Sequence, residues 1–230
     1  MIFYAFHDQG MLRVAAATPL GSVGDVDANA DRILDLWRRA DAEGADLVVF
    51  PELSLSSYAI DDLHLQDAML DTVENAVARL IEAGRDLAPV ICIGAPLRRS
   101  GRLYNCALAI ARGRLLGVTP KSYLPNYREY YEKRWFAPGV GLTGLEISVG
   151  GHIAPFGVDL IFAAMDLDDF VFHTEICEDY WAPLPPSTAA AMAGALVLCN
   201  LSASNIVIGK ARERAMLAAS QSARALAAYV

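Results

Sequence analysis

Three residues with reactive side chains stand directly after short apolar runs: Glu52, Lys121 and Cys177. Each run predicts a buried strand, and α/β proteins place ligands at the carboxyl ends of such strands. A cysteine attacks as a thiolate, so a reactive cysteine needs a base and a nearby positive charge. If the three strand ends converge, Glu52 supplies the base and Lys121 supplies the charge. Taken alone, Glu52 is most simply an exposed acid and Lys121 a surface lysine, while Cys177 fits a core thiol and a nucleophile equally well. Only the combination is specific.

The remaining thiols and the nearest histidine do not predict a competing site. Cys92, Cys106 and Cys199 lie inside apolar strand patterns and are interpreted as small core residues. His173 precedes Cys177 by four residues in one predicted strand, which separates the two side chains by about 13 Å. A papain-like Cys–His pair is therefore poorly supported. The cysteines have no CxxC spacing, and we predict no metal site.

Composition excludes several classes of protein. The chain has 230 residues, of which 54% are hydrophobic, and its net charge is −8. Such an apolar chain is not intrinsically disordered, and its acidic balance disfavours nucleic acid or an anionic membrane as a partner. No apolar run reaches the roughly 20 residues of a membrane span. Because the first ten residues also lack a signal-peptide core, we expect a cytoplasmic protein with reduced thiols.

The elements that must position these residues alternate between strands and helices at both ends of the chain. Between them, strands follow one another without long helices, which predicts one domain with a mixed sheet and helices on its outer face. The predicted helices are Asp25–Glu43, Asp71–Leu87, Ser187–Gly194 and Lys210–Ala228. The predicted strands are Leu12–Thr18, Ala45–Pro51, Pro89–Pro96, Leu103–Ala111, Leu115–Thr119, Leu145–Val149, Val158–Ala164, Phe170–Ile176 and Ala195–Cys199.

The order and spacing of the three residues resemble the Glu–Lys–Cys triad of the nitrilase superfamily. Glu52 and Lys121 are 69 residues apart, and Lys121 and Cys177 are 56 apart. The flanking sequences look more specifically like the glutaminase domain of glutamine-dependent NAD⁺ synthetases. They are FPELSLSS (Phe50–Ser57), KSYLPNYREYY (Lys121–Tyr131), EICED (Glu175–Asp179) and NLSASN (Asn200–Asn205). This resemblance implies a four-layer α-β-β-α sandwich with mixed sheets, and a homo-oligomer.

The resemblance also implies a role for each matching residue in the reaction. Cys177 would attack the side-chain amide of L-glutamine and form a γ-glutamyl thioester. Glu52 would act as general base and acid, and Lys121 would stabilise the oxyanion together with a backbone N–H. Glu132 aligns with the second glutamate of the family, and the neighbouring Glu129 competes for that role.

A further set of residues matches the substrate-binding positions of the family. An acid at Glu178 suits the α-ammonium of glutamine, and the base at Lys210 suits its α-carboxylate. Relatives often carry arginine at the latter position, and a lysine does not make the bidentate contact of an arginine. The complete set is Tyr58, Tyr127, Glu132, Glu178, Ser204 and Lys210.

In the family the ammonia passes to a synthetase domain that converts nicotinate adenine dinucleotide to NAD⁺ with ATP and Mg²⁺. The SGGxDS loop of that domain has no counterpart here, and the glycine cluster at 139–144 is interpreted as a flexible turn. We therefore expect residues 1–230 to form a nitrilase-like domain without a cofactor of its own. The apolar end ALAAYV predicts a cut before the last strands of the domain. The alternatives are a free-standing amidase for another small amide and a non-catalytic fragment.

Overall fold

Two mixed β-sheets lie face to face in the computed structural model, which describes residues 6–167 and 169–230. Their strands are β1 (Val14–Ala16), β2 (Leu47–Val49), β3 (Val90–Arg99), β4 (Arg102–Ala111), β5 (Arg114–Pro120), β6 (Leu145–Val149), β7 (His152–Phe156), β8 (Phe162–Ala163), β9 (Val171–Ile176), β10 (Val197–Leu201) and β11 (Ala228–Tyr229). The larger sheet has the order β1-β2-β3-β4-β5-β7-β6, and the smaller one has the order β11-β10-β9-β8.

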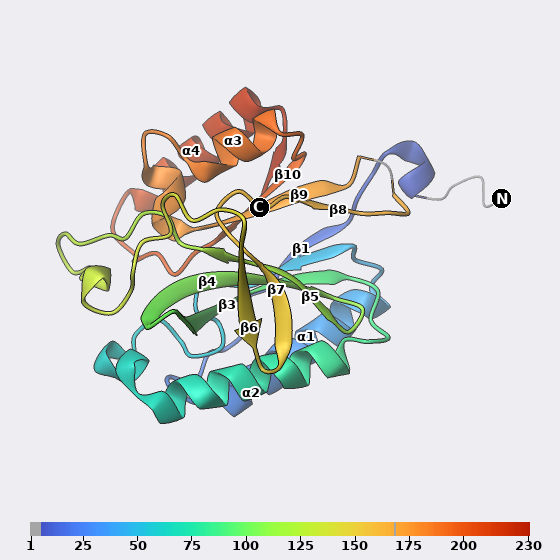
Figure 1. Cartoon of the computed structure of the whole chain (residues 1–230). Coiled ribbons are helices and arrows are strands. Elements are labelled where there is room, and N and C mark those ends of the chain that lie inside the picture. The colour runs from blue at the N-terminus through green and yellow to red at the C-terminus, as the bar shows by residue number, and fades with distance from the viewer. Residues whose placement is uncertain (1–5, 168) are drawn as a thin grey trace.

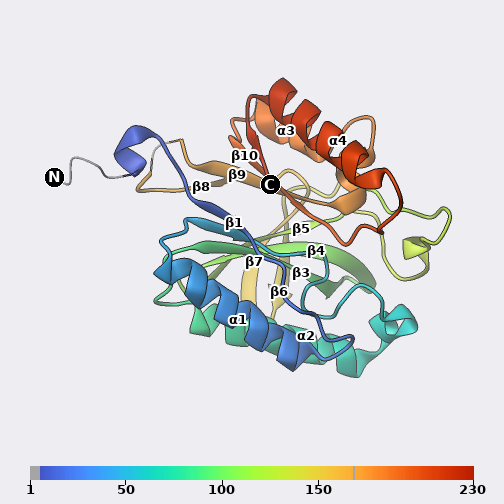
Figure 2. The same cartoon turned by 180° about the vertical axis from the view of Figure 1, so that it is seen from behind.

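Helices cover the outer face of each sheet. The α-helices are α1 (Val26–Ala42), α2 (Asp67–Ala83), α3 (Pro186–Met192) and α4 (Lys210–Ala225). Short 3₁₀ turns are η1 (His7–Gln9), η2 (Asp61–Leu65), η3 (Glu132–Arg134) and η4 (Cys177–Trp181). Figures 1 and 2 show α1 and α2 beneath the larger sheet, and α3 and α4 above the smaller one. This arrangement confirms the four-layer α-β-β-α sandwich, whereas element alternation alone predicted a single sheet.

Alternation of side chains along β2 explains why its sequence is continuously apolar. Val48 points to the core between the larger sheet and its helices, while Leu47 and Val49 point to the core between the two sheets. A strand buried on both faces has no polar position. Cys92 and Cys199 also lie in the inter-sheet core, which confirms that they are packing residues.

Helix α1 forms where the apolar stripe and the cap predict it. The carboxylate of Asp25 accepts the N–H of Ala28 at 3.1 Å and so caps the first turn. Along the stripe, Ile33 and Trp37 are fully buried, and the indole N–H of Trp37 donates to the carbonyl of Pro89 at 3.0 Å. The indole N–H is the only polar group of this buried side chain, and the bond to Pro89 satisfies it.

Several predicted elements differ from the structure. Strand β7 was missed, because the Gly150-Gly151 turn that joins it to β6 was not recognised as a hairpin signal. The strand predicted at Val158–Ala164 is only the two-residue β8. Helix α2 begins at Asp67 and ends at Ala83, in both cases four residues earlier than predicted. Helix α4 ends at Ala225, where Leu226 adopts a left-handed conformation, and the chain then pairs with β10 as β11.

None of the helices in the described ranges combines the length and the apolar character needed to cross a membrane.

Candidate active site

Glu52 stands in the turn after β2 and is almost completely buried. Gly94 on the neighbouring strand β3 lies against this turn so closely that a Cβ atom there would sit 2.8 Å from the carbonyl carbon of Glu52. Only glycine allows that approach. The packing of β3 therefore fixes the position of the glutamate backbone.

The carboxylate of Glu52 is held by three hydrogen bonds. Its Oε1 atom accepts from Lys121 Nζ at 2.6 Å and from Asn105 Nδ2 at 2.7 Å. Its Oε2 atom accepts from the N–H of Ala203 at 3.0 Å. Because a carboxylate oxygen accepts about two hydrogen bonds, Oε1 is saturated and Oε2 keeps one acceptor site. The free site of Oε2 is the one available to a thiol proton.

Lys121 follows β5 and has no exposed side-chain surface. Its Nζ atom lies between Glu52 and Glu132, at 2.7 Å from Glu132 Oε1. Burial disfavours the ammonium form, but the two carboxylates outweigh that effect and raise the pKa of Lys121. The lysine is therefore a fixed, desolvated positive charge.

Cys177 comes from the other sheet, at the end of β9, and is the first residue of η4. Its φ angle is +45°, a left-handed conformation that costs a non-glycine residue roughly 1–3 kcal/mol. Burial and the charge of Glu52 raise the pKa of the thiol, whereas Lys121 and the N–H of Ala203 lower it. The resting thiol is thus neutral and needs a base for its proton.

The structure separates the two glutamates that competed for the position beside the lysine. Glu132 is buried, and its Oε1 atom also accepts the hydroxyl of Tyr58 at 2.8 Å. Burial and the charge of Glu52 raise the pKa of Glu132 to about 7. Glu129 is exposed and bonds to Asn205 instead. Geometry therefore places Glu132 against Lys121.

Of the predicted substrate set, Glu178 directly follows Cys177, Ser204 directly follows Ala203, and Lys210 is the first residue of α4. The hydroxyl of Tyr127 bonds to both carboxylate oxygens of Glu178, at 3.0 and 2.9 Å. The ammonium of Lys210 lies 5.2 Å from the centre of the Trp181 ring and bonds to Asn205. Ser204 is half-buried in the segment between β10 and α4.

Three residues that contact this group were not singled out from the sequence. Asn105 and Ala203 bond to Glu52, and Asp179 bonds to the segment after Lys121. A signal existed for Asn105, since an amide inside the buried strand YNCALAI is unusual. The contact of Ala203 joins residues 151 positions apart, and no local pattern indicates it.

The described residues contain no group of three or more histidine, cysteine or acidic side chains suited to a metal ion.

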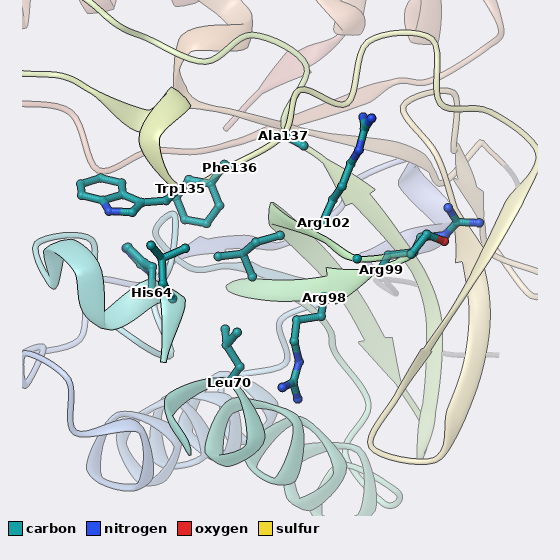
Figure 3. A pocket seen from close by; sticks show the side chains of 12 residues that line it. His64, Leu70, Arg98, Arg99, Arg102, Trp135, Phe136 and Ala137 are labelled. Carbon is teal, nitrogen blue, oxygen red and sulfur yellow. The ribbon is translucent and has the colours of Figure 1, made fainter. Parts of the chain in front are cut away.

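A separate surface pocket of about 640 Å³ lies beside η2 and the tip of the β3–β4 hairpin. Figure 3 shows His64, Trp135 and Phe136 on one side of it and the side chains of Arg98 and Arg102 on the other. Arg98 is engaged by three acids of α2. Burial lowers the pKa of His64 to about 4, so its imidazole is neutral at pH 7. None of Glu52, Lys121 and Cys177 lines this pocket.

Curated relatives match the whole of this chain. The glutamine-dependent NAD(+) synthetase of Mycobacterium tuberculosis (strain ATCC 25618 / H37Rv) is 55% identical over 230 residues, which are 100% of this chain and 34% of that protein. The protein of the same name from Aquifex aeolicus is 33% identical over 87% of this chain and 31% of its own length. The chain thus spans about a third of the relatives it matches.

Solved structures share the fold. A glutamine-dependent NAD(+) synthetase from Cytophaga hutchinsonii has a TM-score of 0.83 at 27% identity, over 95% of this chain and 35% of that chain. An amidase from Nesterenkonia sp. has a TM-score of 0.70 at 19% identity, over 95% and 75% of the two chains. Residues 13–230 match the family model of the carbon-nitrogen hydrolases. Because that match covers nearly the whole sequence, the chain belongs to the carbon-nitrogen hydrolase family.

Proposed function

We propose that this chain hydrolyses the side-chain amide of L-glutamine and releases ammonia. The observation that carries the proposal is the buried Glu52–Lys121–Glu132 group beside Cys177. The name of the relatives that are 55% identical over the full chain supports glutamine as the substrate.

In the first half of the reaction the thiol proton of Cys177 moves to Glu52 Oε2, and the sulfur attacks the amide carbon. The carbonyl oxygen becomes an oxyanion, which the ammonium of Lys121 stabilises in a site without bulk water. Glu52 then returns the proton to the amide nitrogen, the C–N bond breaks, and ammonia leaves. The product on the enzyme is a γ-glutamyl thioester of Cys177.

In the second half a water molecule gives a proton to Glu52 and attacks the thioester carbon. The C–S bond breaks, glutamate leaves, and Glu52 returns the proton to the sulfur. Both halves use the same base and the same cation. This repeated use explains why Glu52 and Lys121 are held so rigidly.

Glu178 and Lys210 supply the charges for a zwitterionic amino acid. Glu178 with Tyr127 would receive the α-ammonium group, and Lys210 with Ser204 would receive the α-carboxylate. Glu132 would keep Lys121 oriented, with Tyr58 as its partner.

For the whole protein we propose a longer chain with a synthetase domain that uses the ammonia, ATP and Mg²⁺ to form NAD⁺ from nicotinate adenine dinucleotide. Relatives about three times the length of this chain support that proposal. The hydrolase domain would hold no cofactor, and the protein would work in the cytoplasm as a homo-oligomer.

The test is ammonia release from glutamine by the chain and by Cys177→Ala, with Cys199→Ala as the matched control. We expect release by the wild type and the control and none by Cys177→Ala. Unchanged release by Cys177→Ala would overturn the assignment of the nucleophile.

A further inference from the structure

Asp179 is a buried carboxylate that joins the two segments carrying Lys121 and Cys177. It is 1% exposed and lies in η4, two residues after the cysteine. Its Oδ1 atom accepts the N–H groups of Ser122 and Tyr123, at 3.0 and 2.8 Å. Its Oδ2 atom accepts the N–H of Ile176 at 2.9 Å.

Two of these bonds connect the two sheets, and the third closes the turn on the cysteine side. Ser122 and Tyr123 follow Lys121 at the end of β5 in the larger sheet. Ile176 precedes Cys177 at the end of β9 in the smaller sheet. One side chain therefore fixes the backbone of the residue after the cation to the backbone of the residue before the nucleophile.

The same carboxylate holds the turn in which Cys177 is strained. The bond from Ile176 to Asp179 closes the chain around the residue with a φ angle of +45°. Such a conformation persists only where the surroundings determine it. Burial raises the pKa of Asp179 to about 8, whereas the N–H groups of Ile176 and Tyr123 and the charge of Lys121 lower it. The two oxygens of Asp179 have the acceptor capacity for all three peptide N–H groups in the ionised and in the protonated form, so the bonds do not depend on its charge.

We infer that Asp179 is a positioning residue, which sets the distance between the Lys121 ammonium and the Cys177 sulfur by clamping the ends of β5 and β9 together. The inference rests on the proposed function for its meaning in catalysis. The positions of the Cys177 thiol and the Lys121 ammonium can be tested without a substrate. The positioning role of Asp179 and the proposed hydrolysis of glutamine can therefore be tested separately.

The test measures the pKa of the Cys177 thiol from the pH dependence of its alkylation by iodoacetamide, followed by peptide mass mapping. Glu52, Lys121 and Glu132 are the charged groups that act on this thiol, and the hydroxyls of Tyr58, Tyr127 and Tyr180 also interact with it. In Asp179→Asn the amide nitrogen cannot accept an N–H, so one side of the clamp is lost. Glu52 stays bonded to the N–H of Ala203 while the segment of Lys121 is released, so the lysine moves away from the sulfur and the thiol pKa should rise by about one unit or more. Alkylation at pH 7.5 should then slow by about tenfold.

A purely electrostatic effect has the opposite sign, because removal of a nearby negative charge lowers the pKa of a thiol. Glu175→Gln is the matched control. Glu175 is a buried carboxylate two residues before Cys177, and it bonds to Ser187 and Tyr229 instead of the Lys121 segment. We expect the thiol pKa of this control to remain within about 0.3 units of the wild type, well below the shift expected from a displaced ion pair.

Asp179→Glu keeps the charge but lengthens the side chain, and it serves if Asp179→Asn does not fold. It should raise the thiol pKa in the same direction. With glutamine as substrate, kcat should fall by about 100-fold in either variant while KM changes by less than about threefold.

An unchanged or lowered thiol pKa in both folded Asp179 variants would overturn the inference, even if their thermal stability fell. A raised thiol pKa in a chain whose wild type does not hydrolyse glutamine would instead leave the clamp in place and refute the proposed function.

Discussion

The two oxygens of Glu52 have different tasks. Oε1 is occupied by Lys121 and Asn105, so it anchors the side chain, while Oε2 accepts one N–H and keeps an acceptor site for a further proton donor. The same negative charge raises the pKa of Cys177. The glutamate thus makes the resting thiol harder to ionise, and in the proposed reaction it also accepts the thiol proton during attack.

Glu52→Gln should therefore lower two observables, the rate of hydrolysis and the pKa of the Cys177 thiol. Hydrolysis of glutamine should fall by about 10²–10⁴-fold because the general base is lost. The pKa of the Cys177 thiol should fall, because a neighbouring negative charge has been removed. Steady-state kinetics and the pH dependence of iodoacetamide alkylation measure the two effects. A thiol pKa that rises in this variant would contradict the electrostatic account of the site.

Lys210 provides a separate prediction about substrate selection. Lys210→Met should raise KM for glutamine by about 10–100-fold with little change in kcat, because a charge-assisted bond to the α-carboxylate is lost. An amide substrate of similar length without an α-carboxylate is the control, and the substitution should not affect its kinetics. Equal losses for both substrates would mean that Lys210 does not contact the carboxylate.

At the scale of the element, strand ends position the reacting groups and close packing fixes them. Gly94 on β3 carries no side chain because the turn that holds Glu52 occupies the space beside it. Close packing against β3 therefore fixes the backbone of the proposed general base. A residue that contacts no substrate thus controls the site through packing.

Gly94→Ala should destabilise the fold by about 1–3 kcal/mol through overpacking and should also lower kcat. Gly21→Ala is the control, because the nearest atom to a Cβ there is 3.6 Å away and the position has no left-handed φ angle. Denaturant unfolding and glutaminase kinetics check both variants. A Gly94→Ala protein with unchanged stability and kcat would show that the close packing of β3 against the Glu52 turn is not needed.

The sequence predicted those residues of the candidate site that directly follow an apolar strand. The runs before Glu52, Lys121 and Cys177 end in polar residues, and the structure places these ends together. The contact of Ala203 with Glu52 depends on how the two sheets pack, which no local pattern encodes. The β7 strand was missed because its exposed Ile153 and its Pro155 give it a weak strand pattern.

At the scale of the whole molecule, the site exists only where the two sheets meet. The larger sheet contributes Glu52 and Lys121, and the smaller sheet contributes Cys177 and Ala203. Thr174 on β9 also donates to Thr119 on β5 at 2.8 Å, a further bond between the sheets. The relative positions of these side chains therefore depend on how the two sheets pack together as well as on the course of each strand.

The outer layer of α3 and α4 supports the proposed homo-oligomer. Gln221 is the buried residue of α4, while Met216 on that helix and Met192 at the end of α3 are 62% and 87% exposed. Replacement of both methionines by glutamate should weaken self-association, because charges would be placed in an apolar contact. Sedimentation velocity measures the change. Ile153→Glu, on the opposite sheet, is the control and should leave association intact.

The most direct test of the central claim is capture of the covalent intermediate. The chain is mixed with labelled glutamine, quenched in acid and mapped by mass spectrometry. We predict a γ-glutamyl group on Cys177 that is absent from Cys177→Ala, with the thiols of Cys92, Cys106 and Cys199 unmodified. Hydrolysis of glutamine by Cys177→Ala, or a γ-glutamyl group on another residue of the wild type, would contradict the account.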